Sequence, residues 1–234
     1  MEQNLINRGV GFFWKILRLN ALFAISNAVL IYALLAVVLH PLTLPIYLLG
    51  VLLAVPSLQA LFLAIRRFEE LEKTSPTELY FRCYRQEWSG AIFYALGYIL
   101  AIAVLFGSFF AQQFMPFRFG LEPVYTVLVI LLYVHLIFGL LVRSYFHISI
   151  AATWRLGLYC ISKYPMTALF IFAGSLLAGA LVGMVHQLIL LGIIPALVYL
   201  LTISTERIIS DLRGIVTFSD SEEEKTNVDS KPNS

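Results

Sequence analysis

Six stretches of this 234-residue sequence contain no Asp, Glu, Lys or Arg and are each at least 19 residues long. A helix needs about 20 apolar residues to cross the hydrocarbon core of a bilayer, which is about 30 Å thick. We therefore expect an all-α fold, a polytopic membrane helix bundle with six transmembrane helices. The predicted spans are residues 19–39, 42–65, 90–115, 124–142, 164–185 and 187–205.

The composition excludes most other classes of protein. Hydrophobic residues make up 60% of the chain and charged residues 13%, whereas soluble domains have about 45–50% and about 25%. A membrane β-barrel would alternate polar and apolar residues, and these runs are apolar throughout. A net charge of +2 does not indicate nucleic-acid binding, and two cysteines are too few for a disulfide framework.

The basic residues predict the orientation of the chain. With the N-terminus inside, 15 of the 16 Lys and Arg residues fall on the inner side, and only Arg118 falls outside. Such an excess is typical of cytoplasmic segments. The outer connections, at residues 40–41, 116–123 and 186, are short, so we expect three hairpins with both termini in the cytoplasm. Residues 1–213 would form one membrane domain, and residues 214–234 a disordered, acidic and polar cytoplasmic tail.

The inner connections have helical and amphipathic patterns. Ser75, Pro76 and Glu78 form a capping-box pattern, which predicts a helix that begins here and continues into the third span. Residues 143–163 combine basic and aromatic side chains without an acidic residue, which is typical of a helix at a membrane interface. The residues predicted to form the cytoplasmic interface are Arg66, Arg67, Arg82, Arg85, Arg155 and Trp154.

A few polar residues lie within the predicted spans, although no Asp, Glu, Lys or Arg does. Asn27, Gln59 and His135 form the candidate intramembrane polar site; such side chains either join helices by hydrogen bonds or bind a solute. His135 could also act as a proton relay or a ligand. Pro56 and Pro195 lie inside apolar runs and predict helix kinks. The sequence contains no motif for a catalytic, cofactor-binding or metal site.

The stretch from Val55 to Arg67 places a proline at the start of an Ala-Leu-Phe-bearing helix that ends in a basic pair. The acidic linker Glu69 to Glu72 and the aromatic-basic stretch Tyr80 to Arg85 follow. Over about residues 5–215, this order resembles the YesL-type family of small bacterial membrane proteins. The resemblance implies the same topology in a bacterial cytoplasmic membrane, with no established catalytic or binding residues. It also implies a context of carbohydrate uptake and breakdown, because family members often occur near genes of that kind.

Three functions are consistent with these patterns. The preferred hypothesis is a non-enzymatic accessory component of a transport system, without a cofactor. Its expected partners are the lipid bilayer and a transporter subunit or a second copy of the chain. The alternative is an independent transporter or channel for a small neutral or lipid-like solute. A structural or lipid-organising role is the third.

Overall fold

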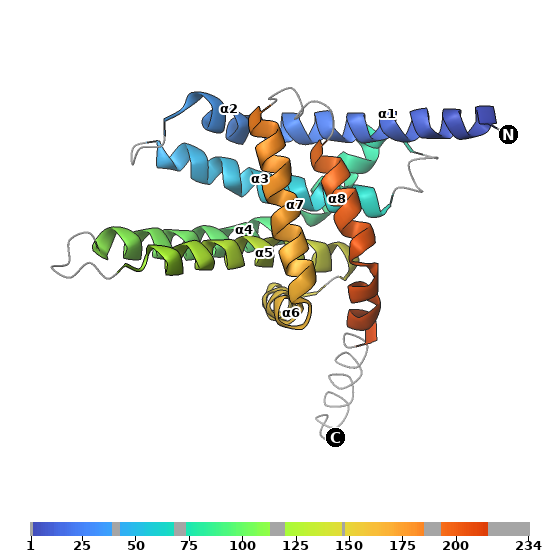
Figure 1. Cartoon of the computed structure of the whole chain (residues 1–234). Helices are drawn as coiled ribbons and strands as arrows, with labels where there is room; N and C mark the ends of the chain where they lie inside the picture. Colours follow the sequence, from blue (N-terminus) through green and yellow to red (C-terminus); the bar gives the residue numbers. More distant parts are fainter. Residues whose placement is uncertain are drawn as a thin grey trace, which may run out of the picture.

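The computed structural model describes residues 2–38, 43–67, 74–112, 120–146, 148–184 and 193–214. All regular secondary structure in these ranges is helical, which confirms the predicted all-α fold. The helices are α1 (Glu2–Ser26), α2 (Ala28–Ala36), α3 (Leu44–Arg66), α4 (Pro76–Gln112), α5 (Glu122–Tyr145), α6 (Ile150–Lys163), α7 (Pro165–Met184) and α8 (Ile193–Ser204) (Figure 1). After a turn at Thr205, residues 206–214 are helical again.

Several predictions concern residues outside the described ranges. These are the acidic linker from Glu69 to Glu72, the outer connections at residues 40–41, 116–119 and 186, and the tail after Gly214. They stay predictions.

Helix α3 forms the centre of the molecule. It contacts α1, α2, α4, α5 and α8, and its most extensive contact is with α4. From Ala60 to Ile65 every side chain is at most 3% exposed, so the second half of this helix is surrounded on all sides. A helix that is apolar around its whole circumference can be accommodated only in such a position or in lipid.

Helix α4 begins at the predicted cap. The Ser75 hydroxyl accepts a hydrogen bond from the Glu78 N–H at 3.2 Å, which satisfies one of the free donors of the first turn. The helix then runs without interruption for 37 residues to Gln112. The prediction that this helix continues into the third span is confirmed.

The first predicted span is not one helix, because it is interrupted at Asn27. This residue has φ −107° and ψ 16°, outside the helical range, and separates α1 from α2. A few uncharged polar residues in a long apolar run hardly change its hydropathy, so hydropathy alone does not predict the break. The N-terminal part of α1 also extends well before the predicted start of the span at residue 19.

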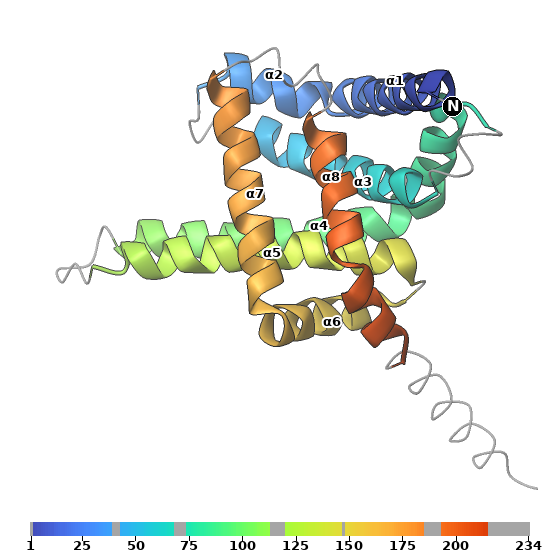
Figure 2. The same cartoon turned by 45° about the vertical axis from the view of Figure 1, so that its right-hand side comes forward.

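Helices α7 and α8 cross the other helices instead of lying along them (Figures 1 and 2). In two views that differ by 45°, α7 and α8 lie side by side and run steeply across α3, α4 and α5 (Figures 1 and 2). Helix α6 is capped by Ser149, whose hydroxyl accepts from the Ala152 N–H, and the chain bends by 98° from α6 into α7. Thr153, Gly157 and Cys160 form the buried face of α6. An amphipathic connector at the membrane interface stays a prediction.

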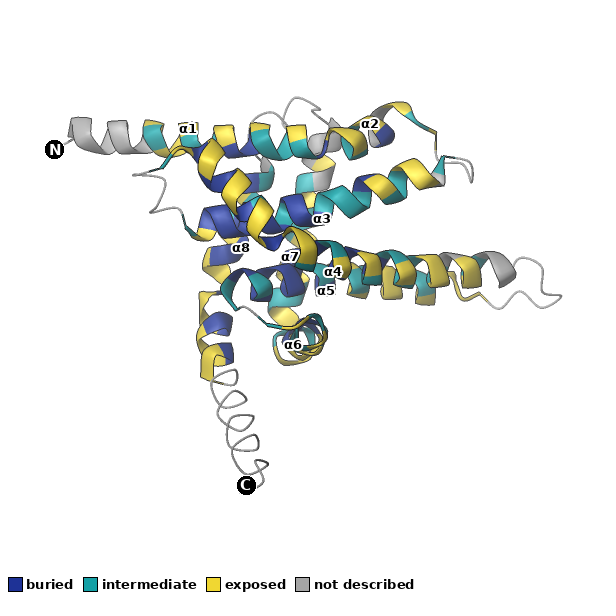
Figure 3. Ribbon diagram, turned by 180° about the vertical axis from the view of Figure 1, so that it is seen from behind, coloured by how far each residue is buried: buried dark blue, intermediate teal, exposed yellow. Residues whose placement is uncertain are grey.

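Three of the described helices are long and apolar enough to cross a membrane: Pro45–Arg66, Pro76–Phe109 and Glu122–Tyr145. The number rises to four if α6 and α7 form one broken span. Only 18% of the apolar window in α4 is buried within the protein, and Figure 3 shows exposed residues along the projecting part of α4 and α5. This apolar surface is compatible with a membrane-embedded protein. Six spans in three hairpins stay a prediction.

Candidate functional site

Asn27 joins the break between α1 and α2 to the central helix. Its Nδ2 atom donates to the Phe23 carbonyl and to the Ser57 hydroxyl, both at 2.7 Å. The Ser57 hydroxyl in turn lies 2.7 Å from the Tyr80 hydroxyl on α4. All three side chains of this chain of bonds are buried. Asn27 therefore supports a junction of four helices, and its amide N–H groups are occupied there.

Gln59 forms a second junction, between α3 and α5. In the amide orientation that satisfies both groups, Nε2 donates to the Leu140 carbonyl at 3.1 Å and Oε1 accepts from the Ser144 N–H at 3.3 Å. Gln59 is fully buried. These bonds run from a side chain to a neighbouring backbone, so they hold two helices at a fixed register.

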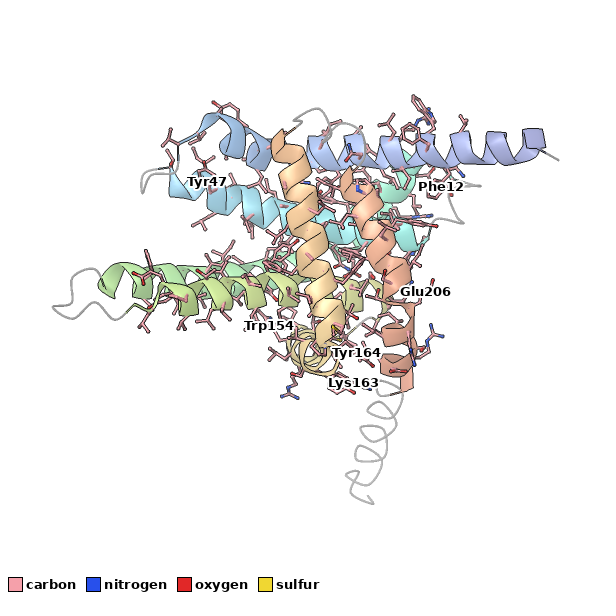
Figure 4. The ribbon with its side chains drawn as sticks, viewed as in Figure 1. Phe12, Tyr47, Trp154, Lys163, Tyr164 and Glu206 are labelled. Carbon is pink, nitrogen blue, oxygen red and sulfur yellow. The ribbon has the colours of Figure 1, made fainter. Side chains whose placement is uncertain are left out.

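His135 lies in a third junction, where α4, α5 and α6 meet. Its Nδ1 atom bonds to the Tyr98 hydroxyl, its Nε2 atom lies 3.0 Å from the Trp154 carbonyl, and the Tyr94 hydroxyl lies 3.1 Å from that of Tyr98. The Trp154 ring stacks on Tyr98, with ring centroids 4.7 Å apart, and lies between α6 and the α4–α5 pair (Figure 4). His135 itself is 2% exposed.

The partners of His135 determine which nitrogen carries the proton. A carbonyl only accepts, so Nε2–H donates to the Trp154 carbonyl and Nδ1 accepts from the Tyr98 hydroxyl. The Tyr98 oxygen can then accept from the Tyr94 hydroxyl. One neutral tautomer thus satisfies every bond in the cluster. The last acceptor is a backbone carbonyl, which has no proton to pass on, so this geometry suits joining helices better than relaying protons.

Two glycines make room for this cluster. A Cβ atom at Gly157 of α6 would lie 2.6 Å from His135 Nε2, and a Cβ atom at Gly139 of α5 would overlap the Tyr94 hydroxyl. The helices can approach this closely only because both positions lack a side chain.

A buried ion pair joins α4 and α5 and was missed by the sequence reasoning. The Arg143 guanidinium donates to the Glu87 carboxylate at 3.0 Å, and the two side chains are 9% and 8% exposed. Gly90 leaves the space that the Arg143 guanidinium occupies. Because the predicted spans contain no charged residue, one begins at residue 90, after Glu87, and another ends at residue 142, before Arg143. The helices α4 and α5 continue past these limits and include both charged residues. Their opposite charges at the adjoining ends of two neighbouring spans were the available signal.

The predicted cytoplasmic interface residues occupy different surroundings. Arg66 packs over the Tyr145 ring at 4.6 Å and donates to the Ser144 carbonyl, whereas Trp154 points into the His135 cluster. Arg67 follows directly after α3. Exposed basic side chains are found at Arg82 and Arg85 on α4 and at Arg155 on α6.

The junction of α6 and α7 is tied to the C-terminal helical segment. The Tyr164 hydroxyl donates to the Asp211 carboxylate at 2.7 Å, and the Lys163 ammonium lies 3.8 Å from the same oxygen atom. Figure 4 shows Lys163 and Tyr164 at this bend. The contact joins the bend between α6 and α7 to residues 206–214.

The structure does not bring Asn27, Gln59 and His135 into one site. Each lies in its own helix junction, with its hydrogen bonds made to neighbouring helices. Pro56 lies within α3, which is assigned as one helix from Leu44 to Arg66, and Pro195 is the third residue of α8. Among the described residues, no three His, Cys, Asp or Glu side chains lie together as metal ligands would.

Residues 16–109 match the model of a family described as a protein of unknown function, DUF624, the family to which YesL-type proteins belong. The match runs from the middle of α1 through most of α4, so it includes Asn27 and Gln59 but not His135. No curated protein and no solved structure matches the chain.

Proposed function

We propose that this chain is a non-enzymatic integral protein of the bacterial cytoplasmic membrane that acts as an accessory component of a transport system. The long apolar helices and the one-sided distribution of basic residues support this placement, with both termini in the cytoplasm. Carbohydrate uptake is the context that the resemblance to YesL-type proteins implies.

The proposal rests mainly on what the intramembrane polar groups bind, which is other helices of the bundle. A transporter that binds its own polar substrate needs polar groups that converge on a cavity. Here the three candidate side chains lie in separate junctions, and the Glu87–Arg143 pair also bonds within the bundle. These groups act to hold the helices together, which is what an accessory subunit requires of its interior.

The N-terminal part of α4 offers a surface for a partner. Arg82 and Arg85 lie exposed near Phe81, which is 47% exposed, and the three side chains line one wide groove together with Ser75. Aromatic and Arg side chains are enriched where protein partners bind. We propose that a cytoplasmic loop or domain of a transporter subunit binds this surface.

Affinity purification from gently solubilised membranes tests the proposal. The wild-type chain should recover a transporter subunit, and Arg82→Glu/Arg85→Glu should reduce that recovery at least ten-fold. Arg207→Glu, at an exposed basic residue on the C-terminal segment, is the matched control and should recover as much as the wild type. Consistent failure of the wild type to recover any partner would contradict the proposal.

The alternative of independent transport has one observation in its favour, an apolar cavity between α1, α3, α5, α7 and α8 that could admit a lipid-like solute. Flux into proteoliposomes containing only this chain separates the two functions. We expect no flux for a panel of sugars and small neutral solutes, and solute flux without any partner would replace the accessory role by transport.

A further inference from the structure

The cavity lies where the two crossing sets of helices meet. It has a volume of about 340 Å³ and is lined by side chains from five helices. The side chains that matter for its chemistry are Phe23 of α1, Leu58 of α3, Tyr133 of α5, Ser175 and Ala178 of α7, and Leu197 of α8. A volume of this size is at the lower end of the range for small-molecule sites, about 300–1,000 Å³.

The lining excludes most kinds of ligand. No charged side chain contributes to it, and the walls are otherwise apolar apart from the Tyr133 and Ser175 hydroxyls. A charged or strongly hydrated molecule would lose its water shell without gaining partners. Apolar cavities stay free of water and accept apolar guests.

The two hydroxyls give the cavity one polar end. The Ser175 hydroxyl donates to the Ile171 carbonyl at 2.7 Å and is also hydrogen-bonded to Tyr133, so the Tyr133 oxygen is the group that keeps lone pairs to accept a hydrogen bond from a ligand. Tyr133 is 36% exposed while it lines the cavity. A ligand with an apolar chain and one neutral hydrogen-bonding group would match both ends.

We propose that this cavity binds the hydrocarbon chain of a neutral single-chain lipid, of the monoacylglycerol class, with its polar group at Tyr133 and Ser175. Two of the helices that line it, α3 and α5, are long and apolar enough to span a membrane, so bilayer lipid is the nearest source of such chains. The proposal rests on the membrane location given above but not on the presence of a transport partner.

Photolabelling of the purified full chain in detergent tests the proposal. The probe is a monoacylglycerol with a diazirine in its alkyl chain, and the adducts are located by peptide mass spectrometry. We expect adducts on the α5 and α7 peptides that contain Tyr133 and Ala178. An excess of unlabelled monoacylglycerol should remove them. Adducts that are equally frequent on exposed residues of α4, such as Leu100, would overturn the proposal.

A substitution that fills the cavity gives the sharper comparison. Ala178→Phe places a large side chain in the cavity and should reduce labelling at least ten-fold. Leu176→Phe, on the same helix but 58% exposed and outside the lining, should label like the wild type. If Ala178→Phe does not fold, Ala178→Leu makes the same test with a smaller side chain. Unchanged labelling in a folded cavity-filled variant would overturn the proposal.

The polar end is tested separately. Tyr133→Phe/Ser175→Ala should weaken labelling by the monoacylglycerol probe about ten-fold and leave labelling by a diazirine-bearing alkane unchanged. Ser108→Ala, which removes a similar bond between a Ser and a backbone carbonyl on α4, is the control. Equal effects on both probes would overturn the assigned polar contact.

The single-chain assignment is tested by competition. A two-chain phospholipid that competes as strongly as monoacylglycerol would overturn it. These labelling experiments need no partner protein. The lipid site can therefore be contradicted while the accessory role stands, and the accessory role can be contradicted while the lipid site stands.

Discussion

The buried polar side chains of Asn27, Gln59 and His135 lie where helices meet. In hydrocarbon an unpaired polar group is expensive, so each such residue must find a partner within the protein. His135 does so with both ring nitrogens and Asn27 with both amide hydrogens, whereas the buried Asn27 Oδ1 atom accepts no hydrogen bond from the described residues. Because interhelical bonds of this kind contribute only about 0.6 kcal/mol each on average, the close packing around them matters as much as the bonds.

The glycine that faces His135 gives the first prediction. Gly157→Ala would push the imidazole away from the Trp154 carbonyl, and we expect the free energy of unfolding to fall by about 1–3 kcal/mol, as for other overpacked cores. At Gly107 on α4 nothing lies within 4 Å of an added Cβ, so Gly107→Ala should be neutral or stabilising, given the higher helix propensity of Ala. Denaturant titration in mixed micelles measures both. Equal stabilities would show that the His135 cluster does not limit the approach of α6.

The buried ion pair gives the second prediction. Glu87→Gln leaves the Arg143 charge buried without its partner, and we expect a loss of about 3–5 kcal/mol in unfolding free energy. Glu87→Leu/Arg143→Met removes both charges and should be less destabilised than the single variant. Glu206→Gln, at an exposed position, should stay within about 0.5 kcal/mol of the wild type. A double variant less stable than Glu87→Gln would contradict this description of the pair.

Among the elements, α4 links the inner surface to the bundle. Its second and third turns carry the exposed Arg82 and Arg85, and its middle carries Tyr94 and Tyr98 of the His135 cluster. The start of α4 therefore affects both the proposed partner surface and the position of that surface relative to α3.

The cap of α4 gives the third prediction. Ser75→Ala removes the acceptor for the Glu78 N–H and should cost about 0.5–2 kcal/mol at the helix start. Ser75→Asp keeps an acceptor and should behave like the wild type. Hydrogen exchange of the amides of residues 77–79 is the direct readout. Faster exchange in both variants alike would mean that the cap is not what starts the helix.

The sequence predicted some elements well for a physical reason. Helices α3 and α5, at residues 44–66 and 122–145, agree with the predicted spans 42–65 and 124–142 to within three residues at each end. Their boundaries follow from the length of an uncharged run, which is a local property. The break at Asn27 involves hydrogen bonds to a distant residue, Ser57, which hydropathy does not contain. The separation of Asn27, Gln59 and His135 likewise depends on which helices are neighbours.

At the scale of the whole molecule, the crossing of α7 and α8 over the other helices decides where the apolar cavity forms. Five helices contribute to its lining, and a bundle of parallel hairpins would have packed them differently. The same crossing places the bend at Lys163 next to the C-terminal segment through Asp211. The lipid site and the partner surface on α4 are lined by different residues, so one can be altered without the other.

The most direct test of the proposed orientation is to determine by cysteine labelling which side of the membrane the predicted cytoplasmic surface faces. Cys83 and Cys160, both buried, are replaced by Ala, and single cysteines are then introduced at Ser75, Arg155 and Gly120. A membrane-impermeant maleimide added to intact cells should label position 120 alone, and positions 75 and 155 should react only after the cells are permeabilised. Labelling of position 75 or 155 from outside intact cells would contradict both the orientation and the proposed cytoplasmic partner surface.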